Sequence, residues 1–167
     1  RFCDTEFVGT DGPGGGKFIN ADGLAAAARS HWPDGSASTP YVVCTGGEPL
    51  LQLDEPLIEA LHESGFEIGV ETNGTIEAPP GIDWLCVSPK GAAPLRQVSG
   101  HELKLVYPQI EPEAQPDRFE SLAFDEFFLQ PLDSPERAEN TRLASAYCDA
   151  HPRWQLSTQT HKDLGIP

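Results

Sequence analysis

Polar and glycine residues gather where predicted strands end. Gly46 and Gly47 follow the apolar run 41–44, and a glycine backbone can approach a ligand closely because it has no Cβ. Glu48 and Glu71 offer carboxylates that can accept hydrogen bonds from an ammonium group. Residues suited to hydroxyls, ring nitrogens or a carboxylate occupy the other strand ends: Asn73, Ser88, Lys90 and Gln130. Together they fit a zwitterionic amino acid joined to a nucleoside.

Each strand end also has a purely structural explanation. Gly46-Gly47 and Asn73-Gly74 can be ordinary turns, and Pro89 can simply end a strand. That explanation weakens when several polar strand ends meet at one edge of a sheet. The position of the strands therefore decides between the two interpretations.

The elements that must position these residues follow a strand–loop–helix pattern. Helices are predicted at 20–31, capped by Asn20 or Asp22, and at 54–65, capped by Asp54. A third is predicted from Ser134 as cap, with Pro135 at the first helical position, to just before residue 152. Strands are predicted at 41–44, 66–72, 84–87, 102–107, 124–129 and 154–157. This pattern predicts a single α/β domain over 1–167 with a parallel sheet, open or closed into a barrel, whose ligands bind at the carboxyl ends of the strands.

Composition excludes several classes of partner. Lys and Arg number 11 against 26 Asp and Glu, a net charge of −15, which argues against binding nucleic acid. No apolar run reaches the roughly 20 residues that span a bilayer, so no membrane association is expected. The first residues, Arg1 to Phe7, do not resemble a signal peptide, so the default expected location is the cytoplasm. Cys44, Cys86 and Cys148 lie in apolar or amphipathic stretches, typical of buried thiols. Cys3 is equally compatible with a ligand and with no role.

Several motifs resemble those of radical S-adenosylmethionine (SAM) enzymes. Gly46-Gly47-Glu48-Pro49 resembles the strand-end motif that holds the methionine amino group of SAM in those enzymes, and Phe2-Cys3 resembles the end of their cluster loop. The fuller set more specifically resembles the 7-carboxy-7-deazaguanine synthase family, over nearly the whole chain from Phe2 to Pro167. That set adds Phe2-Cys3-Asp4-Thr5, Glu71-Thr72-Asn73-Gly74, Ser88-Pro89-Lys90, Leu129-Gln130-Pro131 and Gln159-Thr160-His161-Lys162.

The resemblance implies a fold, a reaction and partners. The fold would be a partial TIM-like barrel of parallel strands with outer helices. A [4Fe–4S] cluster held by three cysteines would bind and cleave SAM. The reaction would convert 6-carboxy-5,6,7,8-tetrahydropterin to 7-carboxy-7-deazaguanine with loss of ammonia, in the route to queuosine and other 7-deazapurines. Mg²⁺, an electron donor such as flavodoxin and a homodimer would complete the system.

The resemblance also assigns residues. Cys3 matches a cluster ligand and so the catalytic centre, and Thr5 matches the Mg²⁺ ligand. Thr45, His161 and the terminal carboxylate of Pro167 match substrate contacts. SAM-binding positions match Phe2, Cys3, Asp4, Gly47, Glu48, Glu71, Asn73, Ser88, Pro89, Lys90, Gln130, Pro131, Leu132 and Asp133.

One feature departs from the family pattern, and two other functions compete. The two remaining cluster cysteines and the family's first strand are expected upstream of Arg1. Another radical SAM enzyme, such as a glycyl-radical activase, would share Gly46-Gly47-Glu48-Pro49, although the tail at 159–167 argues against a protein substrate. A non-catalytic acidic α/β binding module, with Cys3 incidental, would bind neither iron nor SAM.

Overall fold

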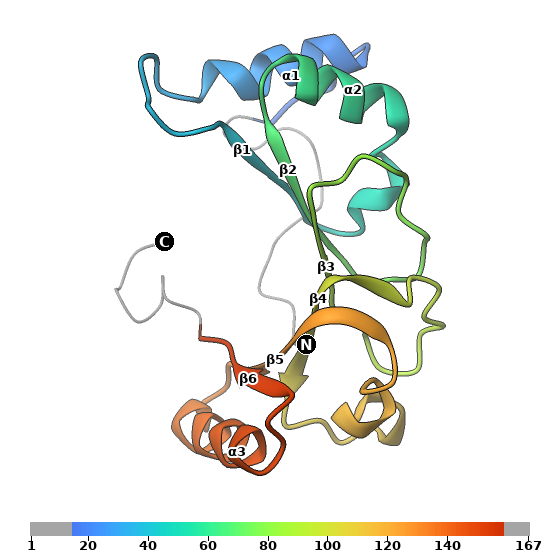
Figure 1. Cartoon of the computed structure of the whole chain (residues 1–167), viewed down its shortest axis with the longest axis vertical. Coiled ribbons are helices and arrows are strands. Elements are labelled where there is room, and N and C mark those ends of the chain that lie inside the picture. Colours follow the sequence, from blue (N-terminus) through green and yellow to red (C-terminus); the bar gives the residue numbers. More distant parts are fainter. Residues whose placement is uncertain (1–14, 159–167) are drawn as a thin grey trace.

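A computed structural model describes residues 15–158 of the chain. In that part, six strands form one sheet in which spatial order follows chain order and every neighbouring pair is parallel. The strands are β1 (Tyr41–Cys44), β2 (Glu67–Thr72), β3 (Trp84–Val87), β4 (Ser99–Tyr107), β5 (Ala123–Pro131) and β6 (Trp154–Leu156). The carboxyl ends of all six therefore lie along one edge of the twisted sheet, as Figure 1 shows.

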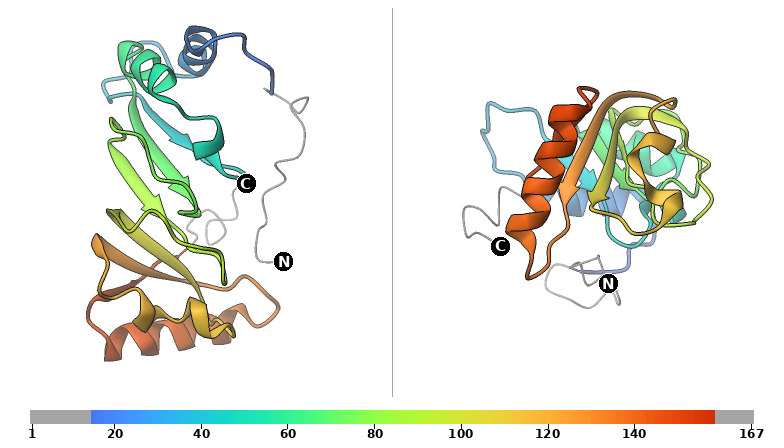
Figure 2. Two further views of the ribbon diagram at one scale, coloured as in Figure 1. Left: turned by 90° about the vertical axis from the view of Figure 1, so that its right-hand side faces the viewer. Right: turned by 90° about the horizontal axis from the view of Figure 1, so that it is seen from below.

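Three α-helices pack at the two ends of this sheet in the described residues: α1 (Ala21–Ser30), α2 (Glu55–Glu63) and α3 (Arg137–Ala150). α2 packs on β2 and α1 on α2, whereas α3 packs on β5 and β6 at the other end (Figures 1 and 2). Short 3₁₀ helices occur at η1 (Pro49–Leu51), η2 (Pro112–Ala114) and η3 (Pro116–Arg118). The connections β2–β3, β3–β4 and β4–β5 contain no α-helix, so the helical crossovers are β1–α2–β2 and β5–α3–β6, the two connections in which the sequence also predicted a helix.

The first two helices begin at predicted caps, and of the two candidates for the first helix the cap is Asn20, while Asp22 lies in the first turn. The side chain of Asn20 accepts a 2.9 Å hydrogen bond from Gly23 N, and Asp54 Oδ1 accepts one of 3.1 Å from Leu57 N. Each bond satisfies an N–H that has no partner inside the helix.

The predicted start of the third helix was wrong. Ser134, Pro135 and Glu136 form a separate turn, closed by a 2.9 Å hydrogen bond from Arg137 N to Ser134 O. The helix begins only at Arg137, so Pro135 does not occupy its first position. The Ser134 hydroxyl caps the turn instead, because it accepts a hydrogen bond from Glu136 N at 3.1 Å.

The two faces of the sheet differ in chemistry. Apolar side chains on one face form the core beneath the helices: Ile68, Val70, Leu103, Leu105 and Leu129 are all 1% exposed or less. Glu71, Cys86 and Glu102 lie in register across β2, β3 and β4 on the opposite face, together with Lys104. We call this second surface the polar face. The alternation follows from the two-residue period of a strand.

The thiols vary in burial. Cys86 is 2% exposed, as the sequence predicted, whereas Cys44 and Cys148 are only half-buried. Burial raises the pKa of all three thiols, and that of Cys86 to about 12. No helix between residues 15 and 158 is long and apolar enough to cross a membrane.

Candidate functional site

The ends of β1 and β2 are joined through one carboxylate. Glu48 Oε1 accepts hydrogen bonds from Thr72 Oγ1 at 2.7 Å and from Leu50 N at 3.1 Å, and Oε2 accepts one from Asn73 N at 2.9 Å. Thr72 is one of two buried polar residues in the described part of the chain, with 2% exposure. Hydrogen bonds to a carboxylate are charge-assisted and strong, so Glu48 fixes these two strand ends relative to each other.

The local sequence explains this geometry. Glu48 is the N-cap of η1, and Pro49 supplies the first residue of that helix. Gly46 has φ +118°, in the region that favours glycine, and this conformation turns the chain after β1. No backbone hydrogen bond of Gly46 or Gly47 forms within residues 15–158. Their peptide groups can therefore serve polar atoms of a ligand.

Backbone hydrogen bonds also link three pairs of neighbouring strands near this edge, β2–β3, β4–β5 and β5–β6. Ser88 N donates to Thr72 O at 2.8 Å, Leu132 N to Tyr107 O at 2.7 Å, and Ser157 N to Leu129 O at 2.9 Å. The predicted residues of the described part thus lie along one edge of the sheet: Thr45, Gly47, Glu48, Asn73, Ser88, Pro89, Lys90, Gln130, Pro131, Leu132 and Asp133. Pro89 and Pro131 are buried, so they shape the edge by packing.

Glu71 does not join Glu48. Consecutive strand residues face opposite ways, so Thr72 reaches Glu48 while Glu71 lies on the polar face. There Glu71 Oε1 accepts a 3.2 Å hydrogen bond from Lys104 Nζ. The structure therefore separates the two carboxylates that the sequence had grouped as acceptors for one ammonium group.

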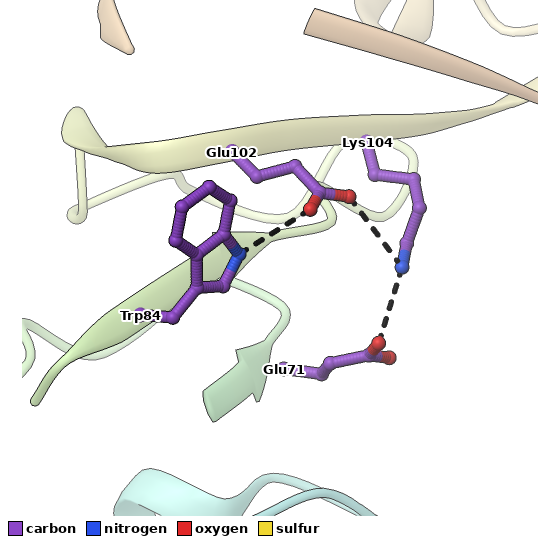
Figure 3. A network of polar contacts seen from close by, with 4 residues as sticks. All are labelled: Glu71, Trp84, Glu102 and Lys104. Atoms are coloured by element: carbon purple, nitrogen blue, oxygen red, sulfur yellow. Dashed lines mark hydrogen bonds and ion pairs between the residues drawn. The ribbon is translucent and has the colours of Figure 1, made fainter. Parts of the chain in front are cut away.

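Lys104 connects Glu71 to a second carboxylate. Its Nζ lies 3.7 Å from Glu102 Oε1, and Glu102 Oε2 accepts a 3.4 Å hydrogen bond from Trp84 Nε1 (Figure 3). Burial lowers the pKa of Lys104, but its interactions with the carboxylates of Glu71 and Glu102 act in the opposite direction, and the pKa lies above its ordinary value. Lys104 is therefore a charged ammonium group at neutral pH.

Sequence reasoning missed Thr72, Glu102 and Lys104 as parts of this site. The segment 101–106 did contain a signal, because polar Glu102 and Lys104 alternate with apolar Leu103 and Leu105. A two-residue period places Glu102 and Lys104 on one face of a strand. Their partner on β2 depends on strand register, which no local pattern specifies.

Six predicted site residues lie outside the described residues: Phe2, Cys3, Asp4, Thr5, His161 and Pro167. Between residues 15 and 158, no group of three or more His, Cys, Asp or Glu side chains is arranged to hold a metal ion. Any role of Cys3 in a cluster and of Thr5 in binding Mg²⁺ stays a prediction.

Comparison with known proteins identifies relatives across almost the whole chain. The 7-carboxy-7-deazaguanine synthase of Caulobacter vibrioides is 61% identical over 166 residues, which cover 99% of this chain and 78% of the relative. The protein of the same name from Bordetella pertussis is 60% identical with the same coverage. No family model matches.

A solved structure shares the fold. The crystal structure of QueE from Escherichia coli superposes with a TM-score of 0.62 at 30% identity, covering 83% of this chain and 63% of that one. The predicted partial barrel of parallel strands with outer helices is thereby confirmed. With relatives at 54–61% identity over essentially its full length, the chain belongs to the 7-carboxy-7-deazaguanine synthase family of radical SAM enzymes.

Proposed function

We propose that this protein converts 6-carboxy-5,6,7,8-tetrahydropterin to 7-carboxy-7-deazaguanine with loss of ammonia, as a radical SAM lyase of queuosine and 7-deazapurine biosynthesis. The observation that carries the proposal is 61% identity over 99% of the chain to a relative of that name. Family membership favours this function over a glycyl-radical activase and over a non-catalytic binding module.

The edge formed by the strand ends fits SAM. Gly46 lies at a φ of +118° with open space where a Cβ would stand, and Gly47 follows it. A polar ligand can therefore approach the peptide groups of both. Because the Glu48 carboxylate already accepts three hydrogen bonds, its main task is to hold this edge rigid. Further SAM contacts are assigned to Glu71, Asn73, Ser88, Lys90 and the segment 130–133.

The chain's own residues bind and orient, while the cofactors supply the reactive species. When bound, the cluster and SAM supply a carbon-centred radical that removes a hydrogen atom from the substrate. We assign Cys3 to the cluster, and Thr45, His161 and the carboxylate of Pro167 to the substrate. Glu48 and Thr72 fix the edge on which SAM is positioned, since misplacement of reacting atoms by about 1 Å is costly in rate.

Further parts of the system are proposed on the family likeness alone. Thr5 binds Mg²⁺ with its hydroxyl oxygen, a ligand suited to that hard cation. A flavodoxin-type donor supplies the electron, two chains form a homodimer, and the protein works in the cytoplasm. Residues 1–167 belong to one radical SAM domain.

The function is tested with the full-length protein reconstituted anaerobically with iron and sulfide. It should bind about four irons per chain, as a [4Fe–4S] cluster requires. With a reductant and SAM it should form 7-carboxy-7-deazaguanine from 6-carboxytetrahydropterin. A colourless protein without iron contradicts the radical SAM assignment, and SAM cleavage without this product points to another radical SAM reaction.

The Mg²⁺ assignment has its own test. Thr5→Ala should weaken the dependence of product formation on Mg²⁺ concentration while SAM binding changes little. Loss of SAM binding would show that Thr5 serves the cofactor and not the cation.

A further inference from the structure

Lys104 occupies a largely desolvated position between carboxylates from two strands. Its side chain is 18% exposed and reaches from β4 across β3, so that Nζ lies 3.2 Å from Glu71 Oε1 on β2 (Figure 3). Burial of an unpaired ammonium group is costly. The groups that contact Lys104 must therefore offset the free-energy cost of desolvating its ammonium group.

The two carboxylates that contact Lys104 differ in their surroundings. Glu102 is 18% exposed, lies 3.7 Å from Lys104 Nζ and is also bonded by Trp84 Nε1 at 3.4 Å. Glu71 is 48% exposed and has Lys104 as the partner of its Oε1. Glu102 is thus the less exposed carboxylate of the network, and Glu71 is the end that solvent or a ligand can reach more easily.

Glu71 lies next to the strand ends that are assigned to SAM. Glu71 immediately precedes Thr72, whose hydroxyl binds Glu48, and Asn73, whose N–H binds the same carboxylate. The exposed end of the network is therefore covalently next to the strand ends assigned to SAM. The interactions run from Trp84 through Glu102 and Lys104 to Glu71.

We propose that Lys104 is a positioning residue of the SAM site, which holds the Glu71 carboxylate in place to accept hydrogen bonds from SAM. The inference rests on the proposed function. Lys104 acts through Glu71 and does not itself contact SAM. The raised pKa of Lys104 supports this role, since the ammonium group keeps its charge across the physiological range.

The test is a double-mutant cycle in the reconstituted full-length enzyme, with the dissociation constant of SAM measured by equilibrium dialysis. Lys104→Met keeps the length of the side chain and removes its charge, and it should raise the dissociation constant about tenfold. Lys104→Arg keeps the charge and should bring the value back to within about threefold of the parent. The KM for SAM should follow the same order, while kcat changes less than about twofold.

The cycle separates positioning from a general structural role. In a Glu71→Gln background, Lys104→Met should change the dissociation constant by less than about twofold, because its target is already gone. A full additional loss in that background overturns the inference, as does an unchanged constant in Lys104→Met alone. The double variant removes the carboxylate of Glu71 and the ammonium group of Lys104 together. If Lys104→Met alone does not fold, the double variant is compared directly with Glu71→Gln.

A matched control breaks an ion pair far from the polar face. Arg142→Met removes the exposed 2.6 Å pair with Glu139 on α3 and should leave SAM binding unchanged. If Arg142→Met weakens SAM binding as much as Lys104→Met does, the effect is not specific and the inference fails.

A parent protein that forms its cluster but binds no SAM overturns both the proposed function and this inference. A parent that binds SAM but is insensitive to Lys104→Met overturns the inference alone.

Discussion

The hydroxyl of Thr72, the last residue of β2, donates a 2.7 Å hydrogen bond to the carboxylate of Glu48 in the segment that follows β1. The same hydroxyl accepts a hydrogen bond from Gly74 N at 3.1 Å. Thr72 is 2% exposed, so water cannot replace either partner without a rearrangement. One buried hydroxyl therefore holds together the two strand ends that we assign to SAM.

Thr72→Val tests this relationship with little change in volume. The substitution leaves one oxygen of Glu48 and the N–H of Gly74 without that partner, and a lost hydrogen bond to a charged group costs about 1.5–3 kcal/mol. We expect the free energy of unfolding to fall by about that amount in urea titrations. The dissociation constant of SAM should also rise.

Thr75→Val is the matched control for this variant. Thr75 is half-buried and three residues away, and its hydroxyl makes no hydrogen bond within residues 15–158. Its replacement should leave both measurements nearly unchanged. Equal effects at the two positions would show that any threonine in this loop matters and that the bond to Glu48 has no special role.

Local chemistry determined which elements could be predicted from the sequence. Asp54 was correctly predicted as a cap, and Asn20 was one of the two candidates for the first helix, because each can bond an N–H three residues away. Ser134 was wrongly predicted, because its hydroxyl and carbonyl oxygen are bonded within a turn that precedes the helix. Its hydroxyl is bonded by Asn140 Nδ2 at 3.1 Å, and the same amide nitrogen also bonds Leu132 O at 2.8 Å. These contacts tie α3 to the end of β5, and no local pattern contains them.

The candidate site, too, could be predicted from the sequence only in part. Its edge was predictable, because parallel strands place their carboxyl ends together. Its pairings were not, since Glu48 and Thr72 are 24 residues apart and Glu71 and Lys104 are 33 apart. Such pairs depend on the register of separate strands, and a shift of one residue would turn Glu71 to the other face.

The apolar face should dominate stability. Leu103 is 0% exposed in the core beneath the helices, whereas Leu51 at the end of η1 is 73% exposed. Leu103→Ala should lower the free energy of unfolding by about 2–5 kcal/mol, through lost burial and a residual cavity. Leu51→Ala should change it by less than about 0.5 kcal/mol. Urea titrations compare the two, and similar costs would contradict the assignment of the core to this face.

Asp83 should contribute to the acid sensitivity of folding. A hydrogen bond from His62 (3.0 Å), and then one from Ile68 N (2.8 Å), lower the pKa of Asp83 below its ordinary value of 3.8. A lowered pKa in the folded state means that the contribution is complete above pH 3.8 and is lost as the pH falls further.

Asp83→Asn should therefore have a lower free energy of unfolding than the parent near pH 7, and the difference between the two should become smaller in strong acid. Denaturant titrations at a series of pH values measure this. Asp125→Asn, at an exposed position of β5, serves as the control. The difference between its free energy of unfolding and that of the parent should stay constant as the pH changes. A gap for Asp83→Asn that stays constant down to about pH 2 would contradict the role of the His62 and Ile68 contacts.

Cys86 should limit stability at alkaline pH. Burial first, and then Glu102 and Glu71, raise the pKa of its thiol from 9.0 to about 12, against an opposing effect of Lys104. A thiol is uncharged when protonated, so the unfolded state loses this proton first, above pH 9, and is stabilised relative to the folded state. The free energy of unfolding should then fall by about 1.4 kcal/mol between pH 8 and 10 from this group alone.

Cys86→Ala should remove that part of the decline, measured in denaturant titrations under reducing conditions. Cys148→Ala, at a half-buried site on α3, is the control and should remove less. Identical pH dependence in the parent and Cys86→Ala would show that the thiol ionises as readily in the folded protein as in the unfolded chain, and so that the polar face is open to water at β3.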